Sequence, residues 1–127
     1  MTPIEQHLEL LKNDYPDAFL TTLPSGAHLV TIPNVRIPAG WNQEIVTLLF
    51  VAPPGYPGAQ PDCFWVEPTG IRLNGGQTPQ GTNDSNAIPE VGQRGTWFSW
   101  HVQHWNPNHD SLVTYTNVVM RRFQSLQ

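Results

Sequence analysis

Three segments between residues 19 and 52 are rich in Val, Ile, Leu, Thr and Phe, the residue types that favour β-strands. Pro24-Ser25-Gly26 and Pro38-Ala39-Gly40 separate them, and short links of this composition are typical of turns between antiparallel neighbours. A fourth short apolar segment follows a turn-rich stretch that ends at Pro61. The sequence therefore predicts a meander of four antiparallel strands, at Phe19 to Leu23, His28 to Ile37, Gln43 to Ala52 and Asp62 to Val66.

Helices are predicted on both sides of this meander. Thr2-Pro3-Ile4-Glu5 has the pattern of a capping box with Pro in the first turn, and Asn13-Asp14-Tyr15-Pro16 ends the helix that it begins. Asp110 is the expected N-cap of a last helix. We expect one α+β domain over residues 1–127, in which both helices lay apolar stripes on the sheet. The stripes are Ile4, Leu8 and Leu11, and then Leu112, Tyr115, Val119, Met120 and Phe123.

Composition limits the function classes that are open to this chain. Its net charge of −4, with only six Lys and Arg, leaves no basic surface for nucleic acid. A single Cys excludes an internal disulfide framework and suits a reducing compartment. No stretch is long enough to span a membrane, and the N-terminus lacks the apolar segment of a signal peptide. We expect a cytoplasmic protein that binds neither nucleic acid nor membrane.

The stretch from Pro68 to Thr96 is long and polar. It is rich in Gly, Asn, Gln, Thr and Pro, and only Ile71, Leu73, Ile88 and Val91 could anchor it to a core. No regular element is predicted there. A loop of this length inside a compact domain usually forms a functional surface.

Trp97 to Tyr115 contains three of the five Trp and three of the five His. An extended backbone at its start would place Ser99 and His101 on one face. A serine hydroxyl becomes a useful nucleophile only when a nearby base removes its proton, a role for His101, or for His104 if the segment bends. The alternative is that Ser99 and His101 only satisfy backbone groups at the end of a strand.

The sequence contains candidates for two other chemistries. Cys63 is an alternative nucleophile by residue type, but its apolar strand is expected to raise the thiol pKa and give it a structural role. His101, His104 and His109 have the spacing H-x2-H-x4-H, which spans the turn at Pro107 and lacks a Cys or a carboxylate pair. No metal and no cofactor is therefore expected.

The motifs and their order resemble a known family. Gly55-Tyr56-Pro57 precedes Pro61-Asp-Cys-Phe-Trp65, and Phe98-Ser-Trp-His101 precedes Trp105-Asn-Pro107. Together with the order of the predicted elements, these motifs resemble the ubiquitin-conjugating enzyme (UBC) superfamily, and more narrowly the prokaryotic family E of ubiquitin-conjugating-like proteins. The resemblance implies a UBC-like fold and two partners, a ubiquitin-like modifier and a ubiquitin-activating-type adenylating enzyme, within a bacterial conjugation pathway.

The departures from the family pattern bear on the chemistry. Conjugating enzymes carry His-Pro-Asn after the fourth strand and a reactive Cys eight residues before the Trp of Trp-x-Pro. Here the tripeptide is absent, and the eighth residue before Trp105 is Trp97. The resemblance therefore favours an acyl transferase that accepts the modifier C-terminus on Ser99 as an oxyester, with Asn74 or the amides of Gly75-Gly76 facing the oxyanion. The alternatives are a catalytically silent UBC-like module that binds the modifier or its activating enzyme, and a loop-rich sheet domain with an unrelated small-molecule site.

Overall fold

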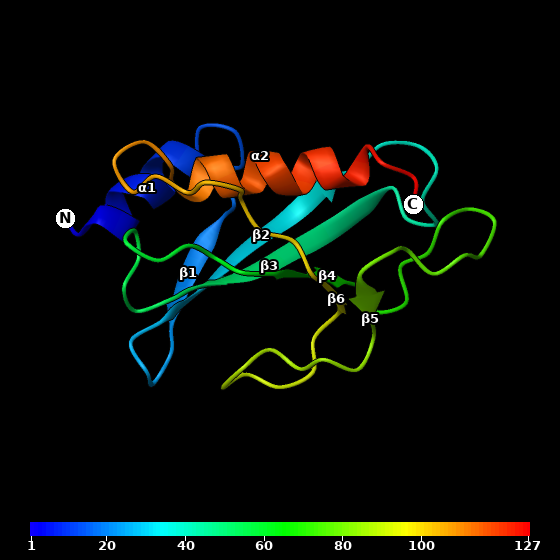
Figure 1. The fold of residues 1–127 in the computed structure, drawn as a ribbon, viewed down its shortest axis with the longest axis horizontal. Coiled ribbons are helices and arrows are strands. Elements are labelled where there is room, and N and C mark those ends of the chain that lie inside the picture. Colours follow the sequence, from blue (N-terminus) through cyan, green and yellow to red (C-terminus); the bar gives the residue numbers. More distant parts are fainter.

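The computed structural model describes residues 1–127 and shows two helices packed on one face of a six-stranded antiparallel sheet (Figure 1). The strand order is β1-β2-β3-β4-β6-β5. This arrangement confirms the predicted α+β, UBC-like fold class. None of its helices has the length and apolar character that crossing a membrane requires. The elements are α1 (Pro3–Leu11), β1 (Phe19–Thr22), β2 (His28–Arg36), β3 (Ile45–Ala52), β4 (Phe64–Glu67), β5 (Thr82–Asn83), β6 (Thr96–Phe98) and α2 (Leu112–Phe123).

The first four strands form the predicted meander. Each pairs antiparallel with the next, and Val30 stands opposite Phe50 in the longest ladder, between β2 and β3. The bounds differ most at β4, which runs from Phe64 to Glu67 instead of from Asp62 to Val66. Pro61 precedes this strand, and Pro is confined to strand ends, edges and bulges because it has no amide to donate.

The main core lies between the helices and the sheet. Four residues of the apolar stripe of α2 have no exposed surface, and α1 adds Ile4 and Leu11. Each large apolar side chain buried in this way stabilises the fold by roughly 1.5–3 kcal/mol relative to leaving it in water. The predicted stripes are therefore the faces that hold the helices on the sheet, with Met120 at the margin. The four fully buried residues of this stripe are Leu112, Tyr115, Val119 and Phe123.

The opposite face of the sheet is covered by the segment 84–95. Figure 1 shows this stretch beneath the strands, on the side away from α2. Ile88 is 1% exposed within a second apolar cluster. The indole of Trp65 donates to the carbonyl of Asn86 at 2.7 Å, and the backbone amide and hydroxyl of Ser25 donate to the Glu90 carboxylate at 2.8 and 2.7 Å. These contacts hold the segment against the sheet.

The expectation that residues 68–96 lack regular structure was wrong in part. β5 lies within this range, and β6 begins at its last residue and pairs with β4. Asp84 organises the segment: its carboxylate accepts from the Gly70 amide at 3.2 Å, the Arg72 guanidinium at 2.5 Å and the Thr96 hydroxyl. The hydrogen bond from Arg72 is the largest cause that holds the pKa of Asp84 below its usual value, and the bond from Thr96 adds to it.

Of the two predicted helix N-caps, one is present and the other is not. The capping box of α1 is present, since the Thr2 hydroxyl accepts from the Glu5 amide at 3.3 Å and the Glu5 carboxylate accepts from the Thr2 amide at 3.1 Å. The N-cap of α2 is Ser111 and not Asp110, so that prediction was wrong. The Asp110 carboxylate instead accepts from the Asn106 amide at 2.7 Å, which closes the turn before the helix.

Candidate functional site

The segment that carries Ser99 runs from the end of β6 to the N-terminus of α2 (Figure 1). β6 ends at Phe98, and one further backbone hydrogen bond, from the Ser99 amide to the Gly81 carbonyl at 2.9 Å, continues the pairing with the segment before β5. At Val102 the chain is held instead by the Gln60 side chain, which exchanges hydrogen bonds with the Val102 amide at 2.8 Å and its carbonyl at 3.0 Å. Ser99 and His101 therefore lie on a short stretch that is fixed at both ends.

Ser99 and His101 line the same open hollow, of about 490 Å³. Both side chains are exposed, and no hydrogen bond joins them or ties the His101 ring to another group. Catalytic hydrogen bonds are often long or unformed in a free enzyme and tighten when substrate binds. The hollow is therefore lined by a residue with a hydroxyl and a residue with an imidazole, both open to solvent. Its other walls are Trp100, Val102 and Gln103 of the same segment, and Val118 and Arg121 of α2.

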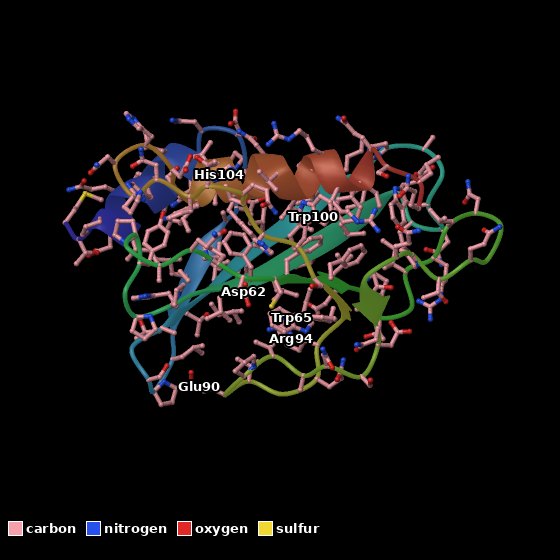
Figure 2. The ribbon with its side chains drawn as sticks, in the orientation of Figure 1. Asp62, Trp65, Glu90, Arg94, Trp100 and His104 are labelled. Atoms are coloured by element: carbon pink, nitrogen blue, oxygen red, sulfur yellow. The ribbon has the colours of Figure 1, made fainter.

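His104 and Asn74 lie outside this hollow. His104 is exposed in a turn with a φ of 56°, and in the view of Figure 2 it projects over the first half of α2, above Trp100. The Asn74 amide donates to the Gly40 carbonyl at 2.9 Å, and Asn74 lines a separate hollow formed mainly by residues 36–44. The structure thus brings Ser99 and His101 together but does not bring Asn74 to them.

Trp97 occupies the position eight residues before Trp105, and its indole is half-buried. It stands opposite Trp65 in the pairing of β6 with β4, and both side chains belong to the face covered by segment 84–95. Figure 2 shows Trp65 and Arg94 on this side of the sheet and Trp100 on the α2 side. An indole packed in this way leaves no reactive group at that position.

Cys63 is half-buried and packs with Trp97 against the second apolar cluster. Burial is the main cause that raises the pKa of its thiol, and the nearby Asp62 carboxylate raises it further. A raised pKa reduces the thiolate fraction at neutral pH, and the thiolate is the nucleophilic form. These properties are those of a structural cysteine.

The Tyr-Pro turn joins the two helices to the Trp-x-Pro motif. The Leu112 amide donates to the Tyr56 hydroxyl at 2.8 Å, and this hydroxyl lies 2.5 Å from Nδ1 of His7 on α1. The Trp105 indole donates to the Pro57 carbonyl at 2.8 Å. The two motifs that carried the sequence resemblance are thus in direct contact.

Two residues behind the Ser99 segment were missed from the sequence as parts of the site. The Tyr115 hydroxyl donates to the Trp100 carbonyl at 2.8 Å, and Arg122 is only 4% exposed beside the Trp100 ring. The sequence could have identified Arg122, because its helical spacing from Tyr115 and Val119 places a cation on the apolar stripe of α2. Elsewhere, His101, His104 and His109 do not converge, and no group of three His, Cys, Asp or Glu side chains that could hold a metal is formed.

Comparison with known protein families matches residues 7–125 to Prokaryotic E2 family E. Searches of curated proteins and of solved structures gave no match. The family match covers nearly the whole chain, including the Tyr-Pro turn, the Ser99 segment and Trp105-Asn-Pro107. The chain therefore belongs to prokaryotic E2 family E and is a ubiquitin-conjugating-like protein.

Proposed function

We propose that this protein accepts the C-terminal acyl group of a ubiquitin-like modifier on the hydroxyl of Ser99, from a ubiquitin-activating-type enzyme. The observation that supports this most is the exposed Ser99 hydroxyl at the end of β6, in one hollow with His101. It lies two residues beyond Trp97, which stands where the family pattern places its reactive Cys. Membership of an E2-like family supports the modifier and the activating enzyme as partners.

The chemistry is an exchange of a thioester for an oxyester. The activating enzyme uses ATP to present the modifier as a thioester. Oγ of Ser99 attacks the carbonyl carbon while His101 takes the hydroxyl proton, the C–S bond breaks, and the leaving thiolate recovers that proton from His101. A positioned general base contributes about 10²- to 10⁴-fold to such a step.

The exposure of His101 suits this role. Its side chain has no hydrogen-bond partner to give up, so it can turn toward the Ser99 hydroxyl within the hollow that they share. The same solvent-open geometry lets a folded modifier bring its C-terminal tail to Ser99. Cys63 is a poorer acceptor, because it is half-buried and its pKa is raised.

A silent binding module is the second candidate. The absence of a hydrogen bond between Ser99 and His101, and the distinct hollow that Asn74 lines, favour this alternative. Such a module would bind the modifier or its activating enzyme without a covalent step. The two candidates differ in whether a covalent adduct forms.

Incubation with the activating enzyme, the modifier and ATP tests the proposal. We expect a covalent adduct that resists thiols and is cleaved by hydroxylamine, as an oxyester is. Ser99→Ala should abolish it, Cys63→Ala should retain it, and His101→Ala should slow its formation by about 10²-fold or more. Thermal unfolding of each variant checks that the loss is not one of folding. An adduct that persists in Ser99→Ala, or a non-covalent complex without any adduct, would contradict acylation at Ser99.

A further inference from the structure

Arg122 is a buried cation that no Asp or Glu side chain pairs with. It is 4% exposed, and no carboxylate of an Asp or Glu side chain lies within ion-pair distance of it. Burying a charge without such a partner is unfavourable unless hydrogen bonds satisfy it. Its guanidinium donates to three backbone oxygens: Nη1 to Ser125 at 3.0 Å, and Nη2 to Gln80 at 3.0 Å and Gln127 at 2.9 Å.

Three aromatic rings complete its surroundings. The guanidinium carbon lies 5.4 Å from the ring centroid of Phe98, 5.7 Å from that of Trp100 and 5.8 Å from that of Trp41. Cations within about 6 Å of an aromatic ring centroid are attracted to the ring, more strongly when the site excludes water. Phe98 and Trp100 are the two neighbours of Ser99 in the chain, so one side chain contacts both flanks of the proposed nucleophile.

The segment across from Ser99 is held by the same residue. Gln80, whose carbonyl accepts from Arg122, precedes Gly81, whose carbonyl accepts from the Ser99 amide at 2.9 Å. Tyr115, about two turns earlier on α2, donates to the Trp100 carbonyl from the same helix. α2 thus contacts both chain neighbours of Ser99 and the segment that pairs with it, and Arg122 makes most of these contacts.

We propose that Arg122 is a positioning residue that fixes the Ser99 backbone at the edge of the hollow. Its effect on acyl transfer rests on the proposed function, whereas its effect on the Ser99 backbone does not. Arginine suits this task because its planar fork can donate in several fixed directions while its faces contact aromatic rings. Lysine would keep the charge but would lose this geometry, so Arg122→Lys separates positioning from charge.

Amide hydrogen exchange measured by NMR tests the proposal without any partner protein. The Ser99 amide is compared with amides at the centre of β3 in wild type, Arg122→Lys and Arg122→Met. Leu29→Ala is the control, because Leu29 is buried on the face of the sheet away from α2 and its truncation lowers stability without touching the Ser99 segment. We expect both Arg122 variants to speed Ser99 exchange by about tenfold or more relative to β3, and Leu29→Ala to leave that ratio unchanged.

Oxyester formation provides a second readout. In Arg122→Lys the rate of ester formation, measured at a saturating concentration of activating enzyme loaded with modifier, should fall by about 10- to 100-fold. The concentration of loaded activating enzyme that gives the half-maximal rate should stay near the wild-type value. If wild type forms no ester, the proposed function fails, and exchange at Ser99 still decides the role of Arg122. Wild-type protection of Ser99 in Arg122→Lys, or an equal loss in Leu29→Ala, would overturn the proposal.

Discussion

Trp97 and Ser99 lie two residues apart, but Trp97 packs against the sheet and Ser99 is exposed. The Trp97 indole packs opposite Trp65, on the face of the sheet that segment 84–95 covers. Ser99 is the first residue beyond β6 and its side chain is exposed. The end of the strand therefore separates a packed position from an accessible one.

Cys63 provides a prediction at this scale. Its half-buried thiol, with a raised pKa, should react slowly with iodoacetamide in the folded protein at pH 7 and rapidly once urea unfolds the chain. Mass spectrometry of timed samples measures both rates. Cys63→Ala should keep oxyester formation at the wild-type level. Rapid labelling of the native thiol together with loss of modifier transfer would instead make Cys63 the acceptor.

The elements differ in how far the sequence could predict them. The first four strands and both helices have local signals, namely apolar segments bounded by Pro and Gly, and stripes of helical period. β5 has only two residues, too few for any period, and depends on pairing with β6. The Asp84 network that orders residues 68–96 joins side chains that composition alone does not connect.

The same limit applies to the candidate site. Ser99 and His101 could be paired from their alternation in the sequence, and the structure places them in one hollow. Asn74 was paired with them by its place in the long loop, where the course of the chain was not predictable. Arg122 was missed because a buried arginine bound by carbonyls and rings resembles an ordinary polar helix residue until the fold brings those partners together.

The N-terminus of α2 gives a prediction at the scale of elements. Ser111 and Asp110 are both competent caps, and the structure assigns the task to Ser111, whose hydroxyl accepts from the Val113 amide at 3.1 Å. Ser111→Ala should lower the free energy of unfolding by about 1 kcal/mol. Asp110→Ala should cost less than about 0.5 kcal/mol, because it removes one exposed hydrogen bond in a turn. Urea denaturation measures both, and the reverse ranking would contradict this assignment of the cap.

At the scale of the whole molecule, Tyr56 connects parts that are distant in the sequence. Its hydroxyl accepts from the first amide of α2 and lies beside the His7 ring of α1. The next residue, Pro57, accepts from Trp105 through its carbonyl. The middle of α1, the N-terminus of α2 and the segment leading from Ser99 to α2 are therefore all in contact with one turn.

This connection should make stability depend on pH through His7. Burial lowers the pKa of His7 in the folded protein, so the unfolded chain binds the proton more readily. The contribution of His7 is thus fully present above its unfolded pKa of about 6.5, declines as pH falls through that value, and levels off below the folded pKa. Urea denaturation of wild type and His7→Gln between pH 8 and pH 5 measures this contribution to the free energy of unfolding. The range brackets the ordinary histidine pKa of about 6.5. A difference in stability between the two proteins that does not change across this range would contradict the prediction.

A change of nucleophile at residue 99 tests the central claim most directly. In a Cys63→Ala background, proteins with the native Ser99 and with Ser99→Cys are each incubated with the activating enzyme, the modifier and ATP. We predict a thiol-resistant adduct that hydroxylamine cleaves when residue 99 is Ser, and an adduct that thiol reduces away when it is Cys, since the acyl group would then be held as a thioester. An adduct whose lability is the same in both proteins, or no adduct in either, would contradict acyl transfer through Ser99.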